Sequence, residues 1–172
     1  MGDLTFSKPF FIFSARKISV EDKQGSVRYY CRKWYRSKKE VLTLSHLEHI
    51  YVYDENGDII VKAEQTSGAR ATWDIKYGED LIQSVTMINH SRVNTSPYWT
   101  IRFQKDEYTL QRKAFSNTTE IRNSYGHVGT MKQYGARMTK HEISWYSSLQ
   151  EKLEPILLGA LYLFTLKDAR PS

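Results

Sequence analysis

The chain has 172 residues, a formal net charge of +6 and a pI near 9.3. Hydrophobic residues make up 40% and charged residues 26%, which excludes wholesale disorder and fits one globular domain, expected over residues 1–172. Cys31 is the only cysteine, so no internal disulfide is possible. The first residues lack the apolar run of a secretory signal, so we expect a cytoplasmic protein.

Repeated turns organise the first four fifths of the chain. The stretches 20–27, 52–59 and 121–128 share a flanking apolar residue at each end, an Asp or Asn, and a Gly three residues after it. A short Asp or Asn side chain can accept a hydrogen bond from the backbone two residues on, and Gly supplies the positive φ that closes a hairpin. Each stretch is therefore predicted to join two antiparallel strands.

Alternating apolar residues predict further strands. Two segments that begin at residues 71 and 97 each carry a row of large apolar side chains, a polar turn and a second row. The count reaches about twelve strands with three more runs, 5–13, 40–46 and 136–146. Because a long meander leaves two unpaired edges that closure removes, we predict a mainly β fold, a closed antiparallel barrel. Trp73, Trp99 and Trp145 are expected in its core or at its rim.

The most apolar stretch of the chain is 156–166, which is predicted to belong to a helix at about 148–167. Pro155 would occupy the first turn of a shorter helix or kink a longer one. Eleven apolar residues are too few to span a bilayer, which takes about 20 residues. The stretch also has no polar stripe, which favours burial on every side, and a barrel of about twelve strands has room for a central helix. We therefore expect no transmembrane segment.

The order of these elements resembles a known family. "ISVEDKQGSVRYY", "LEHIYVYDENGDIIVKAEQ", "ATWDIKYGEDLIQSV" and a closing hydrophobic helix are similar to the tubby C-terminal-like superfamily, which includes tubby proteins, LURP-one-related proteins, phospholipid scramblases and small bacterial single-domain members. The resemblance covers almost the whole chain. It implies a twelve-stranded barrel around a hydrophobic helix, and a non-enzymatic role such as the binding of phosphoinositide headgroups by basic surface residues.

A basic stretch, "RYYCRKWYRSKK" at 28–39, is the predicted ligand-binding surface. Its cations could meet phosphates while the interleaved aromatics sit at headgroup level. These cations are Arg28, Arg32, Lys33, Arg36, Lys38 and Lys39. Strand alternation places Arg28 and Arg32 on the outer face and Cys31 and Lys33 on the other. The expected partner is an anionic lipid headgroup at the inner membrane face or an acidic protein, not a nucleic acid; a merely solvated strand is the alternative.

A second basic group, Lys132, Arg137, Lys140 and His141, flanks Tyr134 and could join the first across the barrel. Metal patterns are incomplete: Asp54, Asn56 and Asp58 lack the glycine of a calcium loop, and His46, Glu48 and His49 lack a suitably spaced further ligand.

No motif predicts a catalytic residue or a cofactor, and Cys31 is expected to be a buried hydrophobe. The predicted function is therefore non-enzymatic. The alternative is a protein-interaction or scaffold barrel of pleckstrin-homology type without a lipid ligand, whose C-terminal helix would cap an open end and carry a polar stripe.

Overall fold

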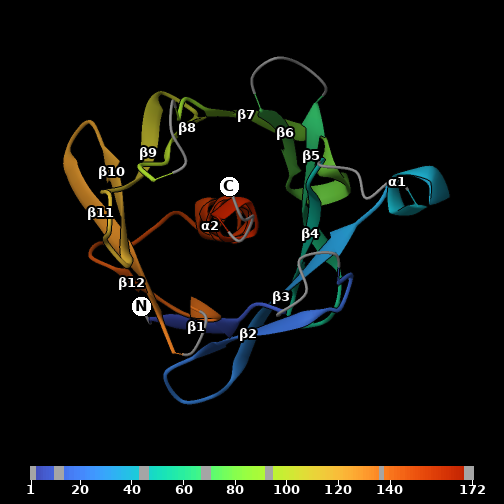
Figure 1. Ribbon diagram of the computed structural model, residues 1–172, viewed down its shortest axis with the longest axis horizontal. Helices are drawn as coiled ribbons and strands as arrows, with labels where there is room; N and C mark the ends of the chain where they lie inside the picture. The colour runs from blue at the N-terminus through green and yellow to red at the C-terminus, as the bar shows by residue number, and fades with distance from the viewer. Residues whose placement is uncertain are drawn as a thin grey trace.

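The computed structural model of the chain describes residues 3–9, 14–42, 47–66, 71–91, 95–135 and 138–168. These residues form twelve strands that close into a barrel, with β1 next to β12 (Figure 1). The strands are β1 (Leu4–Ser7), β2 (Ile18–Asp22), β3 (Val27–Trp34), β4 (His49–Asp54), β5 (Ile59–Thr66), β6 (Thr72–Tyr77), β7 (Gln83–Asn89), β8 (Tyr98–Phe103), β9 (Asp106–Arg112), β10 (Thr118–Asn123), β11 (Gly126–Tyr134) and β12 (Lys140–Trp145). The helices are α1 (Lys38–Leu42) and α2 (Leu153–Asp168), with a 3₁₀ turn η1 (Glu79–Leu81).

Every neighbouring pair of strands is antiparallel, and the register Leu4↔Ile143 closes the ring between β1 and β12. The predicted closed antiparallel barrel is thus confirmed. The rows of alternate apolar residues face its interior, where Trp73 and Trp99 are buried and stack with ring centroids 4.7 Å apart. Trp145 is buried as well.

The prediction of a strand at 40–46 is wrong for the part that the structure describes. Residues 38–42 form α1, whereas 43–46 lie outside the described residues, as do 10–13 of the predicted first strand. The helix has a capping pattern: Ser37 Oγ accepts a hydrogen bond from the Glu40 N–H (3.4 Å), and Glu40 Oε2 accepts one from the Arg36 N–H (2.7 Å). This Ser-x-x-Glu signal outweighs the short apolar run that follows it.

The three predicted turns join β2 to β3, β4 to β5 and β10 to β11. In each turn, one Asp or Asn carboxylate or amide oxygen accepts two backbone N–H groups. Asp22 accepts from the N–H groups of Gln24 and Ser26, and Asp54 from those of Asn56 and Asp58. Asn123 accepts from the N–H groups of Tyr125 and Gly126. Gly25, Gly57 and Gly126 have φ of 80°, 93° and 138°, as the pattern requires.

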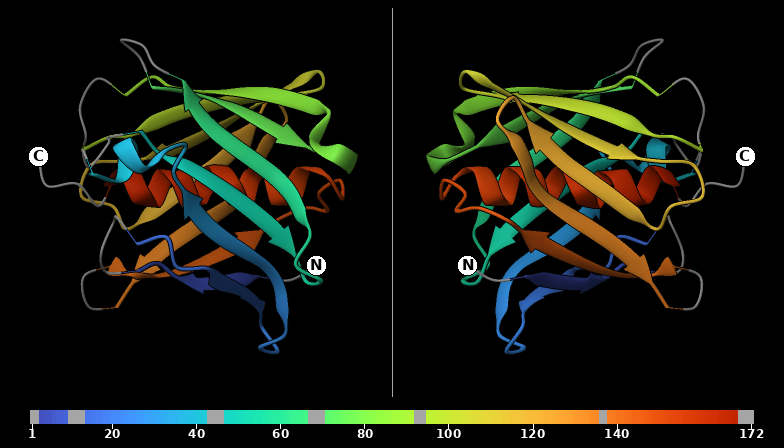
Figure 2. Two further views of the ribbon diagram at one scale, coloured as in Figure 1. Left: turned by 90° about the vertical axis from the view of Figure 1, so that its right-hand side faces the viewer. Right: turned by 90° about the vertical axis from the view of Figure 1, so that its left-hand side faces the viewer.

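The helix α2 runs along the barrel axis and is surrounded by strands (Figure 2). All residues from 156 to 166 are buried, and Leu158, Leu161 and Leu163 have no exposed surface. The central helix is therefore confirmed, and a capping helix with a polar stripe is not found. The helix begins at Leu153 rather than near 148, so Pro155 lies in its first turn. Among the described residues, no helix is long and apolar enough to cross a membrane.

The two ends of the barrel differ and are named here for later use. The "C-terminal rim" is the end at which α2 finishes, and it carries α1 and the connections β1–β2, β3–β4, β9–β10 and β11–β12. The "hairpin rim" is the opposite end, with the turns at 23–26, 55–58, 78–82, 104–105 and 124–125 and the connection 146–152. Figure 2 shows α1 and the last turn of α2 on the same side, away from the β2–β3 turn.

Candidate anion-binding groove

A groove of about 730 Å³ lies on the outer wall of β1 and β2. Alternation turns Leu4, Phe6 and Val20 into the core, so the outward positions of the same strands are small and polar. Thr5 and Ser7 of β1 and Ser19 of β2 line the groove. Short hydroxyl side chains leave the surface hollow and offer hydrogen-bond donors that phosphate oxygens can accept.

Cations and aromatic rings stand around these hydroxyl groups. The cations that line the groove are Lys8, Arg16, Lys17 and Lys140, and the tyrosines are Tyr30 and Tyr134. Glu21 is the carboxylate among the lining residues, and its Oε1 accepts a hydrogen bond from Ser19 Oγ (3.0 Å). The lining is therefore strongly positive, and it combines the point charge of lysine with the planar fork of arginine.

Two of these cations have structural contacts, and two have exposed side chains without an ion pair. Lys17 Nζ lies over the rings of Tyr30 (4.4 Å) and Tyr53 (4.3 Å), and Lys8 Nζ donates to the Thr165 carbonyl at the end of α2 (3.1 Å). Arg16 and Lys140 are exposed, and no ion pair joins either to another described residue. These two cations are accordingly the ones best able to meet an incoming anion.

The structure divides the predicted basic stretch 28–39 among several places. Arg32 is exposed beside the groove, where its Nε donates to the Ala15 carbonyl (3.0 Å). Arg28 lies in a different groove, near the hairpin rim. Arg36 Nε is paired with Glu64 (2.6 Å), and its Nη2 donates to the Gln65 carbonyl (2.9 Å).

Lys38 and Lys39 are exposed on α1, next to Arg36, whose N–H donates to Glu40 of the same helix. Lys33 points into the barrel, as alternation indicates, and cannot contribute to a surface. The stretch is therefore not one continuous patch, and Arg32 is its member nearest the groove.

The second predicted group contributes to the groove through Lys140 and the neighbouring Tyr134. Because β12, β1, β2 and β3 are neighbours, these residues stand across β1 and β2 from Tyr30. Lys132 is exposed on β11, and Arg137 lies outside the described residues. His141 faces the core and stacks on Phe6 with 4.6 Å between ring centroids; burial and the nearby charge of Lys8 lower its pKa to about 3.

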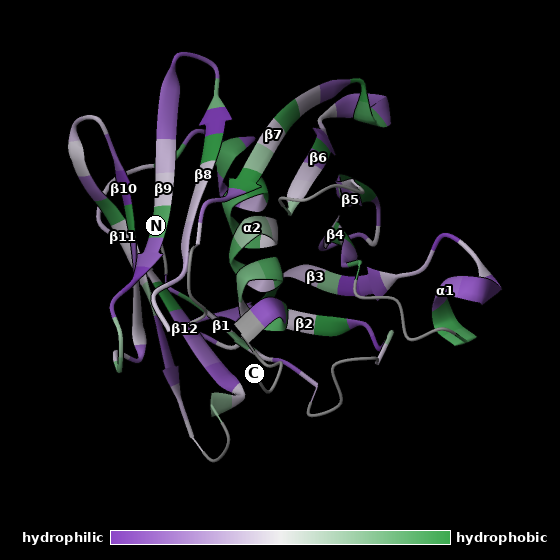
Figure 3. Ribbon diagram, turned by 45° about the horizontal axis from the view of Figure 1, so that its top comes forward, coloured by the Kyte–Doolittle hydropathy of each residue, from purple (hydrophilic) through white to green (hydrophobic). Residues whose placement is uncertain are grey.

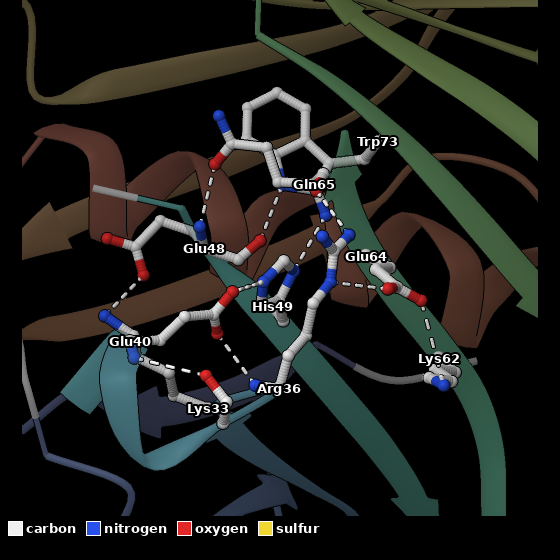
Figure 4. Close-up of polar contacts among 10 residues, drawn as sticks. Lys33, Arg36, Glu40, Glu48, His49, Lys62, Glu64, Gln65 and Trp73 are labelled. Carbon is white, nitrogen blue, oxygen red and sulfur yellow. Dashed lines mark hydrogen bonds and ion pairs between the residues drawn. The ribbon is translucent and has the colours of Figure 1, made fainter. Parts of the chain in front are cut away.

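A buried polar network supports the wall of the barrel beside α1 (Figure 4). Lys33 and Glu48, with 0% and 1% side-chain exposure, form an ion pair of 2.6 Å. The Glu48 carbonyl accepts the Trp73 Nε1–H (2.9 Å), and the Glu48 N–H donates to Gln65 Oε1 (2.7 Å). His49 Nδ1 accepts the Gln65 N–H (2.9 Å), and burial lowers the pKa of His49. These contacts fix the strand ends at the C-terminal rim.

The described residues hold no group of three metal-ligating side chains, and His46 lies outside them. Asp54 serves its turn, as described above. Cys31 is fully buried, and burial raises its pKa, so the thiol is kept from the thiolate form that nucleophilic chemistry needs.

Charge is distributed unevenly between the two ends. The connections and strand ends of the C-terminal rim carry Lys8, Arg16, Lys17, Lys33, Arg36, Lys38, Lys39, Arg112, Lys113, Lys140 and Lys167, against Glu40, Glu48, Glu64 and Asp168. The hairpin rim carries Asp3, Asp22, Asp54, Glu55, Asp58, Glu79, Asp80, Asp106 and Glu151, against Lys23, Arg28, Lys105 and Lys152. The C-terminal rim is therefore the more positive of the two ends.

Comparison with known proteins agrees with the architecture. The model of a family described as Tubby C-terminal like domain matches residues 4–168, nearly the whole chain. No curated protein and no solved structure matches the chain.

Proposed function

Because the chain belongs to the Tubby C-terminal like domain family, we propose that it is a non-enzymatic domain that binds an anionic phospholipid headgroup through the β1–β2 groove. The observation that carries the proposal is the placement of exposed Arg16 and Lys140 around a lining of hydroxyl side chains. A phosphate group in the groove would accept hydrogen bonds from Ser7, Arg16 and Lys140. The neighbouring Arg32 adds charge at the edge.

The charge distribution supports the same proposal. A cation near an anionic membrane surface contributes about 1 kcal/mol, and this attraction falls off within a Debye length. The acidic hairpin rim would be repelled by the same surface. The end of the groove at the C-terminal rim would accordingly meet an anionic leaflet, and the protein would bind peripherally at the inner membrane face.

Vesicle co-sedimentation tests the proposal. Wild-type protein should bind phosphatidylcholine vesicles that contain a phosphoinositide and should not bind vesicles of phosphatidylcholine alone. Arg16→Gln and Lys140→Gln remove one charge each while keeping a polar side chain, so each should weaken binding roughly fivefold, since 1 kcal/mol corresponds to that factor. Added salt should weaken wild-type binding.

The matched control is Lys105→Gln, which removes an exposed cation at the hairpin rim and should leave binding unchanged. Equal binding of wild-type protein to both kinds of vesicle would contradict the proposal. Binding of soluble inositol phosphates would show that the headgroup itself, and not only the bilayer surface, is the ligand. Binding of an acidic protein without any vesicle binding would favour the scaffold alternative instead.

A further inference from the structure

Three connections at the C-terminal rim present large apolar side chains to solvent. Leu42 at the end of α1 is 82% exposed, Phe115 between β9 and β10 is 103% exposed, and Met138 between β11 and β12 is 47% exposed. Figure 3 shows the apolar end of α1 at the periphery of the molecule. Exposed apolar side chains that gather on one face often mark an interaction site.

The backbone conformation at Phe115 is unfavourable for a bulky side chain. Residues 113–116 form a turn in which the Ser116 N–H donates to the Lys113 carbonyl (3.1 Å), and Phe115 is its third residue with φ of 63°. Gly or Asn normally takes this position, because a bulky side chain is strained at positive φ. Met138 also has positive φ, at 51°. The chain thus holds apolar side chains outward where small or polar residues would suit the backbone better.

Each exposed apolar side chain at this rim has a lysine close by in the sequence. Lys38 and Lys39 precede Leu42 in α1, Lys113 precedes Phe115, and Lys140 follows Met138. The hairpin rim also exposes apolar groups, namely Ile82, Tyr125 and Tyr146. Carboxylates surround that end, however, with Glu79 and Asp80 three and two residues before Ile82. The charges, not the apolar residues alone, therefore distinguish the two rims.

We infer that the C-terminal rim docks end-on against an anionic bilayer, with Phe115, Leu42 and Met138 inserted at the boundary between headgroups and acyl chains. The barrel axis would then lie along the bilayer normal, and the hairpin rim would point away. This inference rests on the proposed function and adds an orientation and an apolar contact to it. The groove opens toward the same rim, because Lys8, Pro9 and Lys140 line it, so its cations would lie at headgroup level.

A lipid surface fits this arrangement better than a protein partner. The three apolar side chains come from connections that lie on different sides of the barrel opening, with α1 far from the β9–β10 and β11–β12 connections (Figure 1). A protein interface requires a contiguous apolar core. A fluid bilayer accepts separate apolar side chains flanked by cations, because each inserts independently while the cations meet lipid phosphates.

A single-site label tests the orientation. Cys31 is fully buried, so Phe115→Cys provides the one accessible thiol within the described residues for a polarity-sensitive fluorophore. The matched control is Tyr125→Cys, which places the same label on an exposed aromatic position at the hairpin rim. On adding vesicles with phosphatidylserine, the label at 115 should shift to shorter wavelength and be quenched by nitroxide-labelled lipid. The label at 125 should show neither effect.

The unlabelled variants measure the apolar contribution. Asn tolerates positive φ, so Phe115→Asn should preserve the turn. The variant should bind vesicles roughly tenfold more weakly, the loss expected when most of a buried phenyl group is removed. Tyr125→Asn should bind as wild type does. Vesicle binding that depends on Arg16 and Lys140 but not on Phe115, or equal lipid quenching of both labels, would overturn the end-on inference and leave the groove proposal intact. No vesicle binding by wild-type protein would overturn both.

Discussion

The two halves of the barrel interior differ as much as the two rims do. Toward the hairpin rim the core is apolar and aromatic, with Val20, Phe103, Tyr108 and Val128 around the start of α2. Toward the C-terminal rim lie the inward buried polar and charged side chains that the structure describes: Lys33, Glu48, His49, Gln65, Thr119, Gln133, His141 and Thr165. The C-terminal half of the core therefore contains buried polar and charged side chains, whereas the hairpin half is packed from apolar and aromatic ones.

The direction of α2 explains part of this difference. The last carbonyl groups of a helix have no partner within the helix and form the negative end of its dipole. Lys8 Nζ binds one of them at Thr165, and Lys167 Nζ lies 5.7 Å from the centre of the Trp73 ring. Tight hairpins close one end, and cations gather at the other. The cations at the C-terminal rim thus lie beside the negative end of the α2 dipole.

The largest effect is expected from breaking the buried ion pair. Glu48→Gln leaves the Lys33 ammonium group buried without its counter-charge, which should lower the free energy of unfolding by about 3 kcal/mol or more. Urea unfolding measures the change. In Lys33→Met/Glu48→Leu, both charges are replaced by apolar groups, and most of the loss should be recovered.

The control for this variant lies near the hairpin rim. Glu107→Gln removes one partner of the exposed pair Arg102–Glu107 (3.1 Å) and should cost under about 1 kcal/mol. Equal losses for Glu48→Gln and Glu107→Gln would mean that the two halves do not differ in the way described.

A smaller effect is expected from pH. The pKa of His141 in the folded state is about 3, below its ordinary value of 6.5. As the pH falls below 6.5, His141 therefore gains a proton in the unfolded chain but not in the folded one. Stability from this group is fully present above about pH 6.5 and is lost as the pH falls toward 3. Between pH 7 and 5 the wild type should lose about 2 kcal/mol more than His141→Leu in urea unfolding.

His127→Leu serves as the matched control, because it removes an exposed histidine from β11 at the hairpin rim. It should keep the wild-type dependence on pH. If His141→Leu and the wild type lost stability equally between pH 7 and 5, His141 would not be the group responsible.

The smallest effect is a gain in stability at the C-terminal rim. Phe115→Gly removes the steric cost of positive φ and should raise the free energy of unfolding by about 0.5–1 kcal/mol. Tyr125→Gly changes an exposed aromatic without positive φ at the hairpin rim, and it should lower stability slightly, because Gly makes the unfolded chain more flexible. Thermal unfolding compares the two, and a loss of stability in Phe115→Gly would show that its backbone is unstrained.

The hairpin rim was the more predictable of the two ends. Its turns depend on local chemistry, an Asp or Asn side chain and a Gly within a few residues, and such signals are complete in the sequence. The central helix was predictable for a similar reason, because 156–166 is apolar on every side. About twelve predicted strands and this helix together predicted a closed barrel.

The C-terminal rim was less predictable because it is built from distant parts of the chain. The groove takes Ser7, Arg16, Tyr30 and Lys140 from four strands or their ends, and barrel closure alone makes them neighbours. Charge counting along 28–39 favoured one patch, whereas alternation and the acidic partner Glu64 divide it. The Ser-x-x-Glu pattern at Ser37 and Glu40 indicates a helix, whereas the apolar residues after it favoured a strand.

Pairing of β1 with β12 also constrains how the protein can fold during synthesis. Contacts such as Leu4↔Ile143 join residues from opposite ends of the chain, and such long-range pairing slows folding. The inward apolar rows of all twelve strands have no central partner until α2 has left the ribosome and entered the ring. The nascent barrel must therefore wait, with apolar strand faces and two open edges exposed, for its last element, and during that interval it depends most on protection from aggregation.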